Sequence, residues 1–344
     1  MMPVVSVLLP CFDAAATLEE ALESLWRQSF TDFEVIAVND GSSDATGEIL
    51  ARAARDPGAD VRLQVLETAH QGIASALRAA RLEARGQLIA RMDADDRAHP
   101  DRFRLQVDHL HQNPDLSVSC SRVRLFPRDA LKDGYLRYEA WINALLTHDD
   151  IRRNLFVESP IPHPTVMMRR DALDAAGGYR ANGWPEDYDL WMRLAFSGHR
   201  FEKLDDVLVD WREAPTRASR IDPIFSAERF MDVKEHYLRD HVLDPSRPLA
   251  VWGAGPVGKL WGRRLWPRYF IEVDPRKVGQ TIGGASVIAS DELTRVEGFF
   301  VIVAVASLSR TRDENAPWRA ARDEIRNELT AAGFEENRDS MCVA

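Results

Sequence analysis

Cysteine is scarce in this sequence, and long apolar runs are missing. Only three of the 344 residues are cysteines, Cys11, Cys120 and Cys342, and they lie far apart. Three distant cysteines exclude a disulfide framework and a cysteine-based zinc site, and they fit a reducing compartment. The longest apolar run, residues 299–306, is far shorter than the roughly 20 residues of a membrane helix, and residues 4–10 lack the basic segment of a signal peptide. We therefore expect no transmembrane segment and a cytoplasmic location.

An excess of basic charge is also missing. The chain has 44 Lys and Arg against 54 Asp and Glu, which gives a formal net charge of −10. This balance argues against a nucleic-acid partner, because proteins that bind nucleic acid neutralise phosphates with a basic surface. Hydrophobic residues make up 45% and charged residues 28%, which is typical of a folded globular chain. The length favours two domains.

What the sequence does contain is a regular alternation of apolar strands and amphipathic helices. Continuous apolar strands joined by helices indicate a parallel sheet whose carboxyl ends share one edge, and ligands bind at that edge in α/β folds. The polar residues that follow the strands should therefore converge there. The expected strands are residues 4–9, 33–38, 61–66 and 88–92, and the expected helices are 18–28 and 73–84. The polar segments that should meet are residues 11–13, 39–41, 70–72 and 93–96.

The remainder of the chain predicts an extension of this domain, a linker and a second, smaller domain. A helix over 100–112, a strand over 116–120, mixed helical patterning over 121–160 and a last strand over 205–211 complete the first domain, residues 1–218. An amphipathic stretch lies in an expected helical linker, residues 219–245. Residues 246–344 are an expected Rossmann-like α/β domain. Its expected strands are 249–252, 270–273 and 299–306, and its expected helices end at 265 and span 319–332.

The acidic segment Asp93-Ala94-Asp95-Asp96 lies where the fourth expected strand ends. Carboxylates gathered at a ligand-binding edge either repel one another or hold a cation, and their hard oxygen atoms suit Mg²⁺ or Mn²⁺. The alternative is a solvated turn that caps the helix after Pro100. Composition alone does not decide between these two interpretations.

Four segments together resemble the family 2 glycosyltransferases of GT-A fold. They are residues 5–13 (VSVLLPCFD), 38–46 (VNDGSSDAT), 90–96 (ARMDADD) and 185–191 (PEDYDLW). The resemblance covers residues 4 to about 213. It implies inverting transfer of a hexose from a nucleotide-diphosphate donor, usually UDP-linked, to an acceptor hydroxyl with Mg²⁺ or Mn²⁺. The signature of processive synthases, Gln-x-x-Arg-Trp, is absent, which favours an enzyme that adds single sugars.

The resemblance also implies roles for individual residues. Asp95 would hold the metal against the leaving diphosphate, and Asp93 would face the ribose or share the metal. Asp40 would accept the N3 hydrogen of a uracil, the alternative being a simple turn residue. His163 would lie near the diphosphate or acceptor, although a structural histidine is an equal alternative. The wall beside base and ribose would be formed by Pro10, Phe12 and Asp13, and Arg78 is a further donor contact that departs from the asparagine-rich spacing of the family.

A single-displacement transfer needs one base on the acceptor side, and Asp187 is the candidate. The apolar residues Leu190, Trp191 and Leu194 indicate a helix packed on the core, so that Glu186 and Asp187 lie at its N-terminus. Glu186 would orient the base or bind the acceptor. The alternative for Asp187 is a helix N-cap without a chemical role.

The C-terminal part contains a Gly-x-Gly-x-x-Gly segment, Gly253, Gly255 and Gly258, after an expected strand, and Asp274 follows the next strand. This pattern fits a dinucleotide fingerprint. Residues 274–279 (DPRKVG) and 283–288 (GGASVI) also resemble the small nucleotide-fold domain of bacterial sugar acyltransferases. We favour a ligand-binding or assembly domain, which would join copies into a homo-oligomer, over a dehydrogenase.

These patterns predict a metal-assisted glycosyltransferase of cell-surface glycan synthesis. Its partners would be a nucleotide sugar and a glycan or lipid-linked acceptor, and a lipid-linked acceptor would place the enzyme at the inner membrane as a peripheral protein. Two other classes stay open. One is an NAD(P)-linked sugar-nucleotide oxidoreductase, and the other is a non-catalytic nucleotide-sugar-binding protein, which would need Asp40 but not Asp187.

Overall fold

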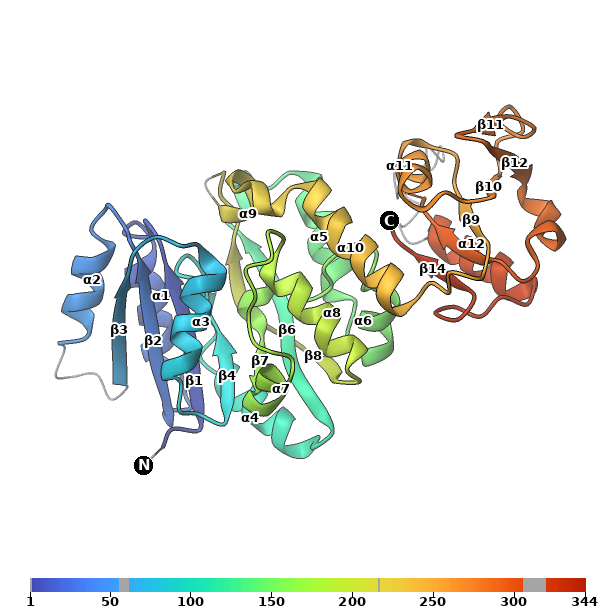
Figure 1. Ribbon diagram of the computed structural model, residues 1–344. Coiled ribbons are helices and arrows are strands. Elements are labelled where there is room, and N and C mark those ends of the chain that lie inside the picture. Colours follow the sequence, from blue (N-terminus) through green and yellow to red (C-terminus); the bar gives the residue numbers. More distant parts are fainter. Residues whose placement is uncertain (1, 56–61, 216, 306–319) are drawn as a thin grey trace. The chain divides into compact units, whose positions relative to one another are not determined.

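The computed structural model describes residues 2–55, 62–215, 217–305 and 320–344 (Figure 1). Its contacts divide the chain into two compact units. The first comprises Met1–Arg152 and Pro160–Phe230, and the second comprises Arg153–Ser159 and Met231–Ala344. Each unit contains one sheet, and the two are described separately below.

The first unit contains an eight-stranded sheet in the order β3-β2-β1-β4-β7-β6-β8-β5. Strands β1 to β4 are parallel, as predicted, and begin within one residue of their expected starts, except that residue 61 lies outside the described residues. Strand β7 joins β4 and β6 by antiparallel pairing. The strands are β1 (Val5–Cys11), β2 (Phe33–Asp40), β3 (Arg62–Thr68), β4 (Leu88–Arg91), β5 (Arg97–Ala98), β6 (Leu116–Phe126), β7 (Met167–Arg169) and β8 (Arg200–Arg212).

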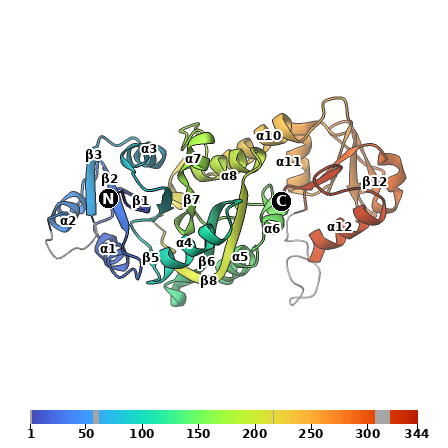
Figure 2. The same cartoon turned by 90° about the horizontal axis from the view of Figure 1, so that it is seen from below.

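Helices cover both faces of the β1–β4 half, α3 (Ile73–Glu83) on one face and α1 (Leu18–Trp26) with α2 (Thr46–Ala53) on the other (Figure 2). Apolar side chains of α1 and of the strands, among them Leu22, Leu25 and Val35, form the core between them. Thr17 precedes α1 but does not form the capping box that its spacing with Glu20 suggests. Its hydroxyl instead donates to the carbonyl of Ala94, 3.0 Å away, in the acidic segment.

The other half of this unit is built around β6 and β8, both longer than predicted. Its remaining elements are α4 (Arg102–Gln112), η1 (Arg128–Ala130), α5 (Asp133–Asn143), α6 (His148–Asn154), η2 (His163–Thr165), α7 (Arg170–Ala175), α8 (Glu186–Phe196), α9 (Ala218–Ile221), η3 (Pro223–Phe225) and α10 (Ala227–His241), the last of which continues into the second unit. Strand β6 pairs in parallel with β8 over its whole length.

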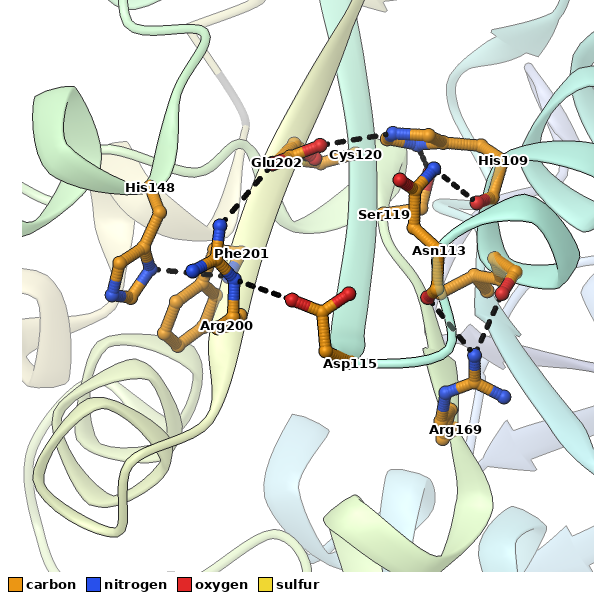
Figure 3. Close-up of polar contacts among 11 residues, drawn as sticks. His109, Asn113, Asp115, Ser119, Cys120, His148, Arg169, Arg200, Phe201 and Glu202 are labelled. Carbon is orange, nitrogen blue, oxygen red and sulfur yellow. Dashed lines mark hydrogen bonds and ion pairs between the residues drawn. The ribbon is translucent and has the colours of Figure 1, made fainter.

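Polar contacts join α4 to these two strands (Figure 3). The Nδ1 of His109 lies 2.9 Å from the hydroxyl of Ser119 on β6, and its Nε2 lies 3.3 Å from Glu202 on β8. Arg200 on β8 pairs with Asp115 at 3.1 Å. The His109 contacts hold α4 against the two strands, and the same face of the helix carries the buried Arg102 and Gln106, which reach the candidate site.

The second unit contains a six-stranded sheet in the order β11-β12-β10-β9-β13-β14. All pairs are parallel except β11 with β12. The expected α/β pattern is therefore present, although the part of the last helix and strand within 306–319 lies outside the described residues. Its elements are β9 (Leu249–Trp252), α11 (Pro256–Leu265), β10 (Tyr269–Glu272), β11 (Thr281–Ile282), β12 (Ala285–Ala289), η4 (Ser290–Val296), β13 (Phe300–Val303), α12 (Ala320–Ala331) and β14 (Ser340–Cys342).

Candidate active site

Three carboxylates gather where β4 ends. Asp93, Asp95 and Asp96 each place one oxygen within 4.8 Å of the others. Asp96 is buried, and one of its oxygens accepts a hydrogen bond from the backbone N–H of Arg212 at 2.7 Å, while the other has no hydrogen-bond partner in the described structure. Burial and the charge of Asp93 raise the pKa of Asp95 to about 6. A close group of oxygens with one orphaned atom fits a hard divalent cation such as Mg²⁺ or Mn²⁺.

Arg91 and Asp93 form an ion pair of 2.5 Å beside this cluster. The Arg91 side chain is almost fully buried at the end of β4, whereas Asp93 is one-quarter exposed. Our sequence analysis missed Arg91. The signal for it was one charged residue at the end of the otherwise apolar segment Leu88–Arg91, every residue of which is buried.

Two buried polar residues of α4 hold the backbone around this pair. Arg102 donates to the carbonyl of Arg91 at 2.8 Å and to Gln106 at 3.1 Å. Gln106 donates to the carbonyl of Thr165 at 2.8 Å, in the loop that carries His163. Burial lowers the pKa of Arg102 to about 9. Buried polar groups need hydrogen-bond partners, and the bonds of Arg102 and Gln106 attach both β4 and the His163 loop to α4.

The far end of β8 is attached to the acidic cluster by Arg212. Besides the backbone bond to Asp96, its Nε donates to the carbonyl of Asp95 at 2.7 Å, and its guanidinium pairs with Glu20 of α1. Arg217 follows in the chain, pairs with Glu213 at 3.1 Å and lies over the ring of Trp211. Its positive charge opposes the upward pKa shifts of both Asp95 and Asp96, so Arg217 lies within electrostatic reach of the cluster.

Glu186 and Asp187 occupy the first turn of α8, as predicted. Glu186 is 1% exposed and one of its oxygens lacks a hydrogen-bond partner, whereas Asp187 is half-buried. Burial raises the pKa of Glu186 above its usual range and that of Asp187 to about 6. Arg91 lowers both pKa values and Asp93 raises both, so these carboxyls lie within electrostatic reach of the β4 end. The N-cap position belongs to Pro185, and Asp189 pairs with Arg193 at 2.8 Å.

His163 is buried between this helix turn and Tyr179. Its Nε2 lies 2.9 Å from the Tyr179 hydroxyl, and its Nδ1 lies 3.7 Å from Glu186. Burial and the charge of Arg91 lower the pKa of His163 well below its usual range, so the imidazole is neutral. The structure therefore brings His163 to Glu186, and its role toward a diphosphate or acceptor stays a prediction.

Asp40 is buried at the end of β2, where four donors surround its carboxylate. The backbone N–H groups of Gln71 and Gly72 donate to it at 3.0 and 2.8 Å, the Thr68 hydroxyl at 3.2 Å, and the Nδ1 of His70 lies 2.9 Å away. These contacts anchor the loop that leads into α3. A uracil would have to replace one of these donors, so the assignment of Asp40 to the base stays a prediction.

The residues expected to flank a nucleotide lie on the same sheet edge. Phe12 is 49% exposed and stacks on His70 with a centroid distance of 4.0 Å. Asp13 adopts a positive φ of 44° and accepts from the backbone N–H of Ser43 at 2.7 Å. Pro10 is half-buried near the end of β1. The structure thus brings Phe12 and Asp40 to a common partner, His70.

Arg78 lies on the exposed side of α3 and lines a groove of about 260 Å³. Arg81, Asp174 and Tyr179 line the same groove, and Arg81 pairs with Asp174. Tyr179 also carries the hydroxyl that contacts His163. Whether Arg78 contacts a donor stays a prediction.

The glycine loop of the second unit is closely packed. A Cβ at Gly258 would come within 1.7 Å of the Gly253 carbonyl, and Gly253 has a φ of 112°. The acid that reaches this loop is Glu272, which accepts from the backbone N–H of Ala254 at 3.1 Å. Asp274 pairs instead with Arg276 at 2.9 Å, and Gly255 precedes α11.

The comparisons with known proteins concern the N-terminal part of the chain. The family model described as Glycosyl transferase family 2 matches residues 6–177. The amylovoran biosynthesis glycosyltransferase AmsE of Erwinia amylovora is 30% identical over 195 residues, which are 57% of this chain and 70% of that protein. The UDP-Gal:alpha-D-GlcNAc-diphosphoundecaprenol beta-1,3-galactosyltransferase of Escherichia coli is 26% identical over 239 residues, covering 69% of this chain and 84% of the relative.

Solved structures support the same fold. TarS of S. aureus, in complex with UDP-GlcNAc, aligns with a TM-score of 0.56 at 18% identity over 70% of this chain and 68% of that chain. The mannosyltransferase PcManGT from Pyrobaculum calidifontis, with GDP-Man and Mn²⁺, aligns with a TM-score of 0.56 at 24% identity over 71% of this chain and 67% of that chain.

The family match ends before the main part of the second unit, so the expected kinship of that part with acyltransferase domains rests on the sequence alone. Among the described residues, no helix is both long and apolar enough to cross a bilayer. The family match spans half of the chain and contains the acidic cluster, Asp40 and His163. The chain belongs to glycosyl transferase family 2 and is a glycosyltransferase of GT-A fold.

Proposed function

We propose that this enzyme transfers a sugar with inversion from a UDP-linked donor to an acceptor hydroxyl, with Asp187 as the general base. One observation carries this proposal: the half-buried Asp187 at the start of α8 lies within electrostatic reach of Asp93 in the acidic cluster at the end of β4. A candidate base and a candidate cation site therefore lie within electrostatic reach of each other.

The donor side is supported by the acidic cluster. Asp95 and Asp93 would hold Mg²⁺ or Mn²⁺, and a divalent cation there neutralises charge on the departing diphosphate. Arg91 keeps Asp93 oriented, and Arg212 fixes the backbone of Asp95. PcManGT is described with GDP-Man and Mn²⁺, and TarS with UDP-GlcNAc.

On the acceptor side, Asp187 accepts the proton of the attacking hydroxyl while that oxygen forms a bond to the anomeric carbon. The bond from this carbon to the diphosphate oxygen breaks in the same step, and the electron pair leaves with the nucleoside diphosphate. Asp187 is the better base of the two acids because it is half-buried, whereas Glu186 is enclosed. Glu186 and the neutral His163 lie behind it, 3.7 Å apart, and would keep the turn in place.

The acceptor we propose is a growing cell-surface glycan on a lipid carrier. The names of the relatives support it: one acts in amylovoran biosynthesis, another in O-antigen biosynthesis, and a third on a diphosphoundecaprenol acceptor. An enzyme with such an acceptor works at a membrane surface as a peripheral protein.

The test compares Asp187→Asn with Glu186→Gln. If Asp187 is the base, Asp187→Asn lowers transfer by roughly 10²- to 10⁴-fold and leaves the affinity for UDP with Mn²⁺ unchanged. Glu186→Gln should retain most activity. Transfer and UDP titration are measured on the same preparations with a product-mass assay over several UDP-sugars. Loss of transfer in Glu186→Gln alone would shift the base to Glu186, and full activity in both variants would refute the proposed mechanism.

A further inference from the structure

The outward face of α11 in the second unit carries an aromatic and basic surface. Lys259 and Arg263 are one helical turn apart, Trp266 follows at the end of the helix, and all three are exposed. Arg268 is exposed just beyond them, before β10 begins. The opposite face of α11 packs Trp261 and its neighbours into the core. We call Lys259, Arg263, Trp266 and Arg268 the α11 patch.

Trp266 has a left-handed backbone conformation, which is unfavourable for a residue with a large side chain. It has a φ of 54° and a ψ of 57°, the left-handed conformation of a helix C-terminus. Glycine or asparagine usually occupies such a position, because a Cβ strains this backbone. The side chain is 77% exposed, so packing within the described chain does not repay this cost. A large aromatic ring exposed at a position that favours glycine is available for a contact outside the chain, and it lies next to basic side chains of the same surface.

The sequence around Trp266 is basic, although the chain as a whole is acidic. The segment between Asp244 and Glu272 contains five basic residues and no acidic one, in a protein of net charge −10. The five are Arg247, Lys259, Arg263, Arg264 and Arg268.

Three of these basic residues are available to a partner. Arg264 is compensated by Asp232 and Glu235 of α10, at 2.9 and 2.8 Å, and Arg247 by Asp339. Within the described residues, Lys259, Arg263 and Arg268 form no ion pair, and all three belong to the α11 patch.

We propose that the α11 patch binds an anionic lipid bilayer. Tryptophan prefers the headgroup level of a membrane, and basic side chains are attracted to acidic lipids. In a protein of net negative charge, a local group of unpaired basic side chains favours contact of that surface with an anionic bilayer. A second copy of the chain is less suitable, since a stable dimer needs about 800 Å² from each partner and one ring supplies much less. The inference does not depend on the catalytic residues and would give the proposed lipid-linked acceptor a physical route to the enzyme.

The test is sedimentation of the full chain with vesicles. One set contains phosphatidylcholine alone, and in the other about a third of the lipid is phosphatidylglycerol. We expect binding to the anionic vesicles only, with loss at high salt. The double variant Lys259→Gln/Arg263→Gln should weaken it by about 25-fold, since each charge near the surface contributes about fivefold.

Trp266→Gly separates binding from folding. Glycine suits the left-handed position, so the unfolding temperature should stay or rise while vesicle binding falls by about tenfold. The matched control is Val273→Ser/Arg276→Gln. Val273 is 65% exposed and lies past the other end of β10, and Arg276 is already paired with Asp274. This control should bind like the wild type.

Three results would overturn the proposal. They are equal binding to neutral and anionic vesicles, unchanged binding of the Trp266 and double variants, and a Trp266-dependent dimer that does not bind vesicles. None of them depends on whether the protein transfers a sugar, so failure of this inference is distinguishable from failure of the proposed reaction.

Discussion

The guanidinium of Arg91 lies 2.5 Å from the carboxylate of Asp93, and this ion pair gives Asp93 a different charge environment from that of Asp95. Asp93 is compensated by a buried cation. Among the residues that the structure describes, Asp95 forms no ion pair, and its pKa is raised to about 6 by burial and by Asp93. We therefore expect ionised Asp93 to stabilise the folded protein and ionised Asp95 to destabilise it, although both are candidates for holding the metal.

Metal-free stability should separate these two residues. Asp93→Asn leaves the buried Arg91 unpaired and should lower the free energy of unfolding by about 3 kcal/mol. Asp95→Asn should raise it at pH 8. A carboxyl with a raised pKa is ionised at a cost in the folded state, and that cost builds up between the ordinary pKa of about 4 and the folded pKa of about 6, so it is fully present at pH 8. Urea denaturation at pH 5 and pH 8 in chelator measures both effects, and an equal loss of stability in the two variants would contradict this account.

Metal-dependent donor binding should require Asp95. Asp95→Ala is expected to remove most turnover and most of the increase in UDP affinity that Mn²⁺ produces, because the site loses a negative oxygen ligand. Titration calorimetry with UDP, with and without Mn²⁺, measures the effect. Asp101→Asn is the matched control, since Asp101 is a surface residue that pairs with Arg104. If Mn²⁺ enhances UDP binding equally in Asp95→Ala and in the control, the cluster is only a turn.

The pH profile of turnover should have an acid limb set by Asp187. The base must be ionised to accept a proton, and its pKa in the free protein is raised to about 6, so kcat/KM should fall as the pH drops through about 6. An ordinary exposed aspartate would lose activity about two pH units lower. Measurements of kcat/KM between pH 4.5 and pH 8 in one buffer series, on a protein shown to stay folded, test this expectation. A flat profile down to pH 5 would disprove it.

Arg217 should assist departure of the diphosphate, because it is the cation after β8 that lies within electrostatic reach of Asp95 and Asp96. Arg217→Gln is expected to lower kcat by about tenfold to 100-fold, the usual effect of removing one charge-stabilising group. Arg220→Gln is the control. Arg220 pairs with the same Glu213, at 3.0 Å, and is not among the main charges that shift the pKa values of Asp95 and Asp96. If the two variants lose equal activity, the effect comes from the shared Glu213 contact.

Strands β1, β2 and β4 could be located from sequence because they are mostly apolar and nearly every residue in them is buried, whereas the edge strand β3 is only partly buried. Strands β6 and β8 are longer than expected because the residues missing from the expected ranges include charged side chains. Arg122 and Arg124 interrupt the apolar pattern of β6, and Arg200, Glu202 and Lys203 interrupt that of β8. Strand β7 has only three residues, Met167–Arg169, which is too short for any periodicity.

In the candidate site, the acidic residues could be predicted from the sequence, whereas the buried arginines could not. Motif order placed Asp93, Asp95 and Asp187. The buried Arg91 and Arg102 were missed because the burial of an arginine depends on contacts of the folded chain, such as the bonds that Arg102 donates to the carbonyls of Arg91 and Val166. The hydrogen-bond donors around Asp40 could not be predicted from the sequence either. Two of its donors are backbone N–H groups about 30 residues later in the chain, and a backbone donor leaves no signature in side-chain identity.

The short segment Arg153–Ser159 belongs to the second unit although the chain before and after it belongs to the first. The buried Lys234 explains its place, because its ammonium donates to the carbonyls of Val157 and Val343, at 2.8 and 3.2 Å. Val343, which shares Lys234 with Val157, is synthesised nearly 200 residues after this segment, so the complete set of contacts can form only when the chain has been made to that point. A gene truncated after residue 230 would encode the family 2 region but not Lys234, so the segment Arg153–Ser159 would lose the hydrogen bond that Lys234 donates to Val157.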